Sequence, residues 1–312
     1  MTHSHDDLVV SRRSSSRQTV NFAGFGVRVF KKHDFGRVQD VHLHGGVIRD
    51  LAISETCPNL LLSVGFDKCA KITDVHNSCV LFNFSLPTAL WSCCWNSVES
   101  SYFYVGGSCG CVDVFDIRNL TRVCQFPALN NSPVHTLYSD RNSLLVGQTQ
   151  SISFCIECMT DHYRRMECPL NAMISSISVD AESRNVLATY RQSSATTNVN
   201  RLELYKLDSL MEEGGYKGPT HAFSNPGSGP SVQRSSVFTR PNFPDDVIVC
   251  ASDQQTPKLN VFSTGCPHFM RQIPVDGVPL DVLPYGSCPS NKNLLAVLNS
   301  KSLQIYRLSQ KE

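Results

Sequence analysis

Fourteen cysteines give this chain several places where a metal could bind or a disulfide could form. The tightest groups are Cys93-Cys94 and Cys109-x-Cys111, and paired thiolates of this kind can bind zinc or form disulfides. Neighbouring residues of a strand point to opposite faces, so Cys93 and Cys94 cannot share a metal without distortion. Cys109 and Cys111 flank a predicted tight turn. We interpret all four as free thiols with a packing role.

A second cysteine group has a spacing nearer to that of a zinc site. It reads Cys155-x2-Cys158-x3-His162-x5-Cys168, one residue out of register with the C-x2-C-x4-H-x4-C of a zinc knuckle. Its first two cysteines lie on a predicted strand, where this spacing puts them on opposite faces, whereas zinc needs four converging ligands. The sequence therefore predicts no metal site and no cofactor in this chain.

Two common cofactor-binding motifs are missing. We find no P-loop and no dinucleotide fingerprint, and no catalytic residue is predicted. A glycosidase would need two carboxylates near each other. Candidates such as Asp67 and Asp281 lie in repeat positions where a structural role is the better interpretation. His42 and His44 could ligate a metal, but an anchoring role in a loop is favoured for His44.

The overall composition limits the classes of partner that this chain could bind. The net charge is +1, so no global basic field would attract nucleic acid directly. No run of about 18 apolar residues predicts a membrane span. The N-terminal residues lack the apolar segment of a signal peptide, and we interpret the cysteines as reduced thiols. These features favour protein partners over nucleic acid or membrane.

Short strands recur along the chain with a period of roughly 40–45 residues. Each unit has an alternating strand, a polar turn, a buried strand, a tight turn and a third strand, as in segments 44–75 and 87–117. Equivalent apolar positions of the first strands are Leu51, Cys93, Leu137, Ile177, Val237 and Val282. Their intervals are 42, 44, 40, 60 and 45 residues. This period predicts an all-β, seven-bladed WD-repeat β-propeller.

The local sequence agrees with that frame. WD repeats read S-G-S-x-D-x-T-I-K-L-W-D across the second and third strands, and residues 63–74 and 106–116 follow it. We assign structural roles in the frame to His44, Ser63, Asp67 and Asp116. Asp67 lies in the tight turn, where His44 is expected to donate a hydrogen bond to its carboxylate. The tryptophan position of the frame is degenerate.

Several longer sequence segments resemble those of one WD-repeat family. They include HGGVIRDLAI, LWSCCW and VFDIRN, with GFGVRVF before them and VLATYR, VIVCASD and PLDVLPYG after them in the same order. The chain resembles the RING finger and WD repeat domain-containing E3 ubiquitin ligases from about Leu8 to Leu308. The match is specific in IRDLA and LWSCCW, and weak in the third unit and after Leu207.

The resemblance implies a function for the family. Its members carry an N-terminal RING, which binds zinc and recruits an E2 enzyme, and a C-terminal propeller that docks replication protein A on single-stranded DNA. They act in the nucleus, in crosslink repair and replication stress. This chain resembles only the propeller, so zinc and E2 contacts are expected only through a RING that it lacks. The alternative is a non-catalytic WD-repeat scaffold in an unrelated complex.

The predicted organisation is a partial blade followed by six units. Residues 1–43 supply the second, third and fourth strands of a blade, and residues 44–312 supply six WD-type units with a long loop at about 208–230. Since a propeller closes by pairing its N-terminal strand with its last blade, we expect the first one or two strands to lie upstream of Met1.

Partner binding is expected at the rim around the central channel of a propeller. The rim positions at the start of the first strands are Arg49, Trp91, His135 and Ser175. Phe66 and Ser108 precede the tight turns. Arginine and tryptophan are frequent hot-spot residues in interfaces. The competing interpretation of Trp91 is packing between blades.

Overall fold

The structure is a computed structural model. It describes residues 1–14, 24–141, 143–156, 164–168, 173–191, 199–212, 218–226, 233–253, 256–286 and 293–308. Within these ranges the strands form seven antiparallel sheets, and in each sheet the strand order follows the chain. The chain divides into two compact units, Met1–Glu167 and Cys168–Glu312. No helix in the described ranges is long and apolar enough to cross a membrane.

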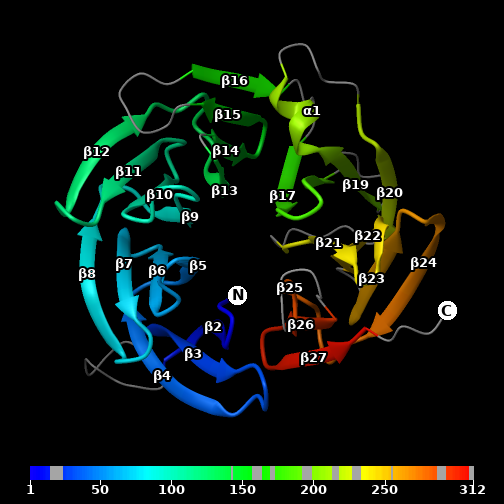
Figure 1. Ribbon diagram of the computed structural model, residues 1–312, viewed down its shortest axis with the longest axis horizontal. Coiled ribbons are helices and arrows are strands. Elements are labelled where there is room, and N and C mark those ends of the chain that lie inside the picture. The colour runs from blue at the N-terminus through cyan, green and yellow to red at the C-terminus, as the bar shows by residue number, and fades with distance from the viewer. Residues whose placement is uncertain are drawn as a thin grey trace. The chain divides into compact units, whose positions relative to one another are not determined.

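The first unit holds four sheets of four strands each (Figure 1). Its strands, sheet by sheet, are β1 (Thr2–His3), β2 (Asp7–Arg13), β3 (Phe25–Lys31) and β4 (Arg37–His44); β5 (Ile48–Ile53), β6 (Leu60–Gly65), β7 (Cys69–Asp74) and β8 (Cys79–Ser85); β9 (Leu90–Trp95), β10 (Tyr102–Gly107), β11 (Val112–Asp116) and β12 (Thr121–Phe126); β13 (Val134–Asp140), β14 (Ser143–Gln148), β15 (Ile152–Ile156) and β16 (Arg164–Cys168).

The second unit holds three sheets, the last with three strands among the described residues. Its elements are β17 (Met173–Asp180), β18 (Asn185–Arg191), β19 (Val199–Lys206), α1 (Leu207–Met211) and β20 (His221–Pro226); β21 (Ser236–Arg240), β22 (Phe243–Ser252), β23 (Lys258–Ser263) and β24 (Cys266–Pro274); β25 (Asp281–Tyr285), β26 (Leu294–Leu298) and β27 (Leu303–Arg307).

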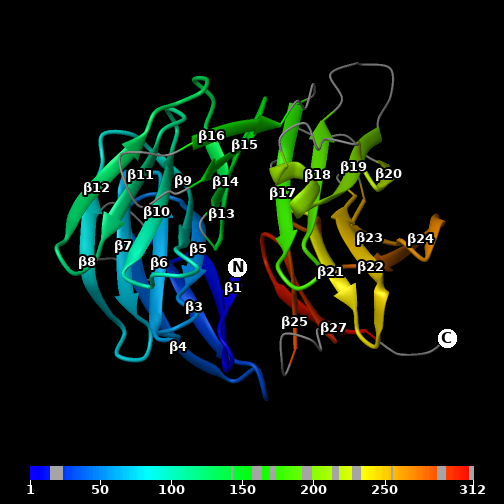
Figure 2. The ribbon, with the colours of Figure 1, turned by 45° about the horizontal axis from the view of Figure 1, so that its top comes forward.

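The N-terminal sheet has one strand more than the sequence predicted. The two residues of β1 pair with β2, Thr2 opposite Val9 and His3 opposite Leu8; Figure 2 labels β1 beside the N-terminus. The turn between them is held by the backbone N–H of Asp7, which donates to Ser4 Oγ at 3.0 Å. A polar strand of two residues has no hydrophobic alternation, so the sequence pattern could not indicate it.

The segment at about 208–230, expected to be a loop, contains two regular elements. Leu207 and Leu210 of helix α1 are buried, and β20 pairs with β19. The prediction was wrong here because Ser-, Asn- and Pro-containing β20 reads as a turn, while its backbone pairing with β19 makes it a strand. Residues 213–217 and 227–230 of this segment lie outside the described residues.

Cores form between neighbouring sheets of each unit. The six apolar positions predicted to be equivalent all lie on the first strand of a sheet, and none is more than 7% exposed. Cys93 belongs to the core between the second and third sheets, whereas Cys94 packs against the core between the third and fourth. The two thiols thus face opposite sides of β9, as the strand geometry predicts.

Candidate functional site

Three of the predicted rim residues form one cluster in the first unit. The guanidinium carbon of Arg49 lies 4.5 Å from the ring centroid of Trp91 and 5.6 Å from that of Phe66. The two rings are 5.3 Å apart and tilted by 55°. Phe66 is 40% exposed, and Arg49 and Trp91 are half-buried. We call Arg49, Phe66 and Trp91 the rim cluster.

A shared backbone feature places the four residues predicted at the strand starts. In β5, β9, β13 and β17 the pairing with the next strand skips one residue, which makes a β-bulge. The skipped residues are Arg49, Trp91, His135 and Ser175. A bulge leaves its extra residue out of the ladder and re-aims its side chain. The same side-chain position therefore recurs in each of these four sheets, although the residue types differ.

Two contacts fix β5 against β9 and so bring Arg49 beside Trp91. The carboxylate of Asp50 accepts the backbone N–H of Cys93 at 3.0 Å and that of Leu51 at 3.0 Å. The indole N–H of Trp95 donates to the carbonyl oxygen of Ala52 at 3.0 Å. The repeat pattern gave no indication of this role of Asp50. The available signal was an acidic residue inside a strand whose other residues, apart from Arg49, are apolar.

The remaining predicted rim residues make local contacts. His135 Nδ1 lies 3.0 Å from the hydroxyl of Thr136. In the second unit, the hydroxyl of Ser175 donates to the carbonyl of Thr189 at 3.1 Å. The backbone N–H of Ser108 donates to the carbonyl of Ala89 at 2.8 Å. The structure gives these three no aromatic or cationic surface comparable to the rim cluster within the residues it describes.

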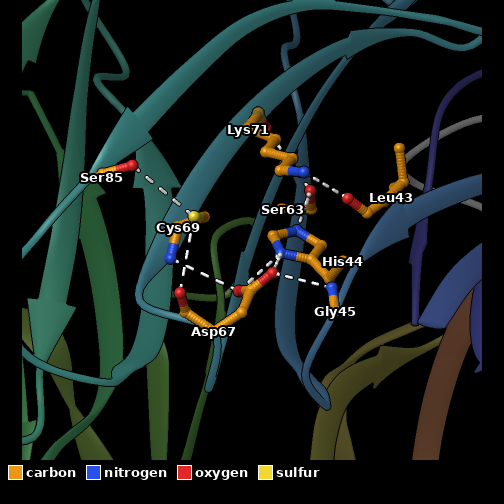
Figure 3. Close-up of polar contacts among 8 residues, drawn as sticks. All are labelled: Leu43, His44, Gly45, Ser63, Asp67, Cys69, Lys71 and Ser85. Atoms are coloured by element: carbon orange, nitrogen blue, oxygen red, sulfur yellow. Dashed lines mark hydrogen bonds and ion pairs between the residues drawn. The ribbon is translucent and has the colours of Figure 1, made fainter. Parts of the chain in front are cut away.

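A buried polar network supports the turn that presents Phe66 (Figure 3). His44, whose side chain is fully buried, has Nδ1 at 2.9 Å from one oxygen of Asp67 and at 3.0 Å from the other. A carboxylate only accepts, so Nδ1 carries the proton. On the other side, Nε2 of His44 lies 2.9 Å from Ser63 Oγ. The network ties β4, β6 and the turn before β7 together.

Further hydrogen bonds tie the Asp67 carboxylate to the backbone. It accepts the N–H of Gly45 at 3.0 Å and that of Cys69 at 3.4 Å. Burial alone would raise the pKa of Asp67, but the hydrogen bonds from His44, Gly45 and Cys69 outweigh it and lower that pKa below its ordinary value. These hydrogen bonds give the Asp67 carboxylate a structural role in the turn, and they do not favour a role as a general acid or base.

Asp116 of the predicted frame caps the turn after β11. Its buried carboxylate accepts the backbone N–H of Arg118 at 2.8 Å and the guanidinium of the same residue at 2.9 Å. Asp74 does the same after β7, where it accepts the backbone N–H groups of His76 and Asn77. Both contacts are structural. They terminate equivalent strands of neighbouring sheets.

The cysteine group at residues 155–168 is described only in part. Cys155 is fully buried, and burial raises the pKa of its thiol to about 11. Cys158 and His162 lie outside the described residues. Among the residues that are described, no group of three or more His, Cys, Asp or Glu side chains converges to hold a metal ion.

A cavity of about 230 Å³ lies at the opposite ends of β5, β9 and β13 from the bulges. Its lining includes Ile53, Thr56, Asn96 and Tyr138. The oxygen of the Asn96 side chain is already engaged by the backbone N–H groups of Val98 and Glu99. The lining is a mixture of strand ends and turn residues and carries no pair of facing carboxylates that would serve a hydrolase.

Comparison with known proteins decides the family. A family model of the WD40 domain of E3 ubiquitin-protein ligase RFWD3 matches residues 1–307. The chain belongs to this WD40 domain family. The seven sheets are accordingly blades of the WD-repeat propeller class, and the predicted family and all-β fold class are confirmed.

Three curated proteins of similar sequence are named after the same ligase as the family model. The chain is 26% identical to the E3 ubiquitin-protein ligase RFWD3 of Ailuropoda melanoleuca over 315 residues, and 26% identical to that of Homo sapiens over 316 residues. The Mus musculus protein is 25% identical over 316 residues. Each alignment covers 96% of this chain and 40% of the relative. The chain thus spans about two fifths of the length of the relatives it matches.

Proposed function

We propose that this WD40 domain is the substrate-recognition propeller of a RING-type E3 ubiquitin ligase, and that the rim cluster is its docking surface. The observation that carries the proposal is the packing of Arg49 against two aromatic rings that also contact each other, one of them 40% exposed, at a bulge of the repeat frame. Arginine and aromatic residues dominate interface hot spots. Three such side chains in mutual contact are pre-organised, which lowers the entropy lost on binding.

The chemistry of the rim cluster specifies the kind of partner segment. A guanidinium held over indole and phenyl rings offers N–H donors to a carboxylate and an apolar aromatic surface beside them. We therefore expect a partner segment with an acidic side chain next to an apolar one. The protein partner we propose is replication protein A on single-stranded DNA, with a role in the nucleus, in DNA repair and the response to replication stress.

Ubiquitin transfer itself is assigned to the larger protein. The relatives are named E3 ubiquitin-protein ligases, and this chain covers 40% of their length. In the proposed division of labour, a RING holding zinc would recruit the E2 enzyme, while the WD40 domain holds the substrate. In this proposal the rim cluster contributes recognition, while the polar contacts of His44, Asp67 and Asp116 stabilise the fold.

The test is a binding measurement with purified replication protein A. Trp91→Ala and Arg49→Ala should each weaken binding at least about tenfold, the loss expected for a hot-spot residue. Arg118→Ala is the matched control, because Arg118 also stacks on an aromatic ring, Tyr102 at 5.3 Å, at the other end of its sheet. It should bind like the wild type.

Two results would overturn the proposal. Unchanged binding in both rim variants would exclude the rim cluster as the docking surface. A folded wild-type chain that does not bind replication protein A at all would favour the alternative, a WD-repeat scaffold for an unrelated complex. Circular dichroism of each variant checks that the strands are intact.

A further inference from the structure

The turn between β10 and β11 brings two thiols together. The backbone N–H of Gly107 donates to the carbonyl of Cys111 at 2.9 Å, and that of Gly110 donates to Gly107 at 3.3 Å. Gly110 has φ +88°, and a methyl group there would lie 2.3 Å from the carbonyl oxygen of Asn130. The turn therefore requires glycine at this position. Its tight path sets the cysteines on either side of Gly110 close to each other.

The sulfur of Cys109 lies back over the turn toward Cys111. A methyl group placed on Gly107 would lie 3.3 Å from that sulfur and 3.6 Å from the carbonyl oxygen of Cys111. The sulfur of Cys109 also lies 3.8 Å from the hydroxyl of Thr88. Both cysteines are free and half-buried, so small solutes can reach them from solvent. Cys93, by contrast, is enclosed in a core between two sheets.

The surroundings make the two thiols unequal. Burial alone would raise the pKa of Cys109, but the hydrogen bonds from the Cys111 backbone, from Thr88 and from the Cys111 thiol bring it below the ordinary value. Burial and the neighbouring Cys109 raise the pKa of Cys111. A thiol with more thiolate character beside a protonated thiol is the arrangement of a reactive cysteine and its resolving partner.

We propose that Cys109 and Cys111 are an oxidation site, at which a hydroperoxide converts the two thiols of this turn to a disulfide. The proposal rests on the tight turn that places the two half-buried cysteines on either side of Gly110, with the Cys109 sulfur lying over that turn, and it does not depend on the docking function.

The chemistry proceeds in two balanced steps. The thiolate of Cys109 attacks one peroxide oxygen, an S–O bond forms, the O–O bond breaks, and the departing alkoxide or hydroxide takes a proton. The sulfur of Cys111 then attacks the sulfenic acid, an S–S bond forms, and hydroxide leaves with the Cys111 thiol proton as water. The two thiols lose two electrons and two protons. The hydroperoxide gains them and is converted to one alcohol and one water, or to two waters when it is hydrogen peroxide. A dithiol reductant reverses the change.

Mass spectrometry of the wild-type chain tests the proposal without any variant. Chymotrypsin cleaves after Tyr104 and Phe115, and the fragment between them contains Cys109 and Cys111 as its only cysteines. After brief treatment of the native chain with hydrogen peroxide, this fragment should lose two hydrogens and resist iodoacetamide. Dithiothreitol should restore both alkylations. Cys57, which is exposed, is the internal control and should remain alkylated.

A substitution separates the two steps. In Cys111→Ser the first step has no resolving thiol, so dimedone should trap a sulfenic acid on Cys109. The proposal is overturned if the fragment remains doubly alkylated at a peroxide dose that oxidises Cys57. It is also overturned if Cys109 is recovered joined to a second chain instead of to Cys111.

Discussion

Asp67→Ala is the perturbation that best measures what holds the rim cluster in place. The carboxylate of Asp67 accepts hydrogen bonds from the His44 ring at 2.9 Å and from the backbone of Gly45 at 3.0 Å. Its removal leaves the ring N–H of His44 without that acceptor, in a side chain that is fully buried. A buried donor left unpaired costs about 1–3 kcal/mol, and a hydrogen bond to a charged group contributes about 1.5–3 kcal/mol.

These two contributions overlap, so the expected loss in the free energy of unfolding is about 2–4 kcal/mol. In a chain of this size such a loss lowers the melting temperature by roughly 5–12 °C. Differential scanning calorimetry of the purified variant measures the shift. Urea titration followed by tryptophan fluorescence gives an independent value, since Trp91 and Trp95 both lie in the next sheet.

Asp74→Ala is the matched control. Asp74 belongs to the same sheet and also accepts backbone hydrogen bonds, at 2.9 Å from His76 and at 3.0 Å from Asn77. These contacts lie at the surface, where water replaces them, so the control should lose much less stability than Asp67→Ala. Equal losses of stability in the two variants would show that burial of the His44–Asp67 pair adds nothing to the free energy of unfolding.

Two other predictions follow from burial and charge. The pKa of Asp67 is lowered on folding below its ordinary value of 3.8, so its contribution to stability is present above that pH and is lost as the pH falls through the folded-state pKa. Urea midpoints measured from pH 7 down to pH 3 should therefore decline less steeply in Asp67→Asn than in the wild type; parallel declines would contradict this. In the second unit, burial raises the pKa of the Cys250 thiol to about 12, so iodoacetamide at pH 8 should alkylate exposed Cys266 and leave Cys250 unmodified until urea unfolds the chain. Rapid labelling of Cys250 in the native chain, read by mass spectrometry, would show that this core opens.

Much of the fold could be predicted because apolar residues recur at equivalent positions of the repeats. Leu51, Cys93 and Leu137 occupy equivalent core positions, and their 42- and 44-residue spacing located the sheets. The pattern missed β1 and β20, which are held by backbone pairing and carry little hydrophobic signal. Strand pairing satisfies backbone groups whatever the side chains are, so such strands leave no trace in composition.

The positions of the candidate site residues in the repeats could be predicted from the sequence, but the contacts between their side chains could not. The repeat frame placed Arg49 and Trp91 at equivalent strand starts. The bulges that free these side chains from the ladder, and the bond from Asp50 to Cys93 that sets β5 against β9, depend on three-dimensional packing. The arrangement of Cys109 and Cys111 was likewise hidden. They flank a turn that depends on the φ of +88° at Gly110, and a periodic pattern does not report such a turn geometry.

Hydroxyl-radical footprinting with and without replication protein A tests whether the rim cluster is the docking surface, and it needs no variant. Phe66 and Trp91 belong to the rim cluster, and Phe243, which is 46% exposed and carries Arg240 at 4.3 Å, is a matched aromatic residue in the second unit. If the rim cluster docks the partner, bound replication protein A should reduce the oxidation of Phe66 and Trp91 and leave that of Phe243 unchanged. Protection of Phe243 with unchanged oxidation of Phe66 and Trp91 would contradict it.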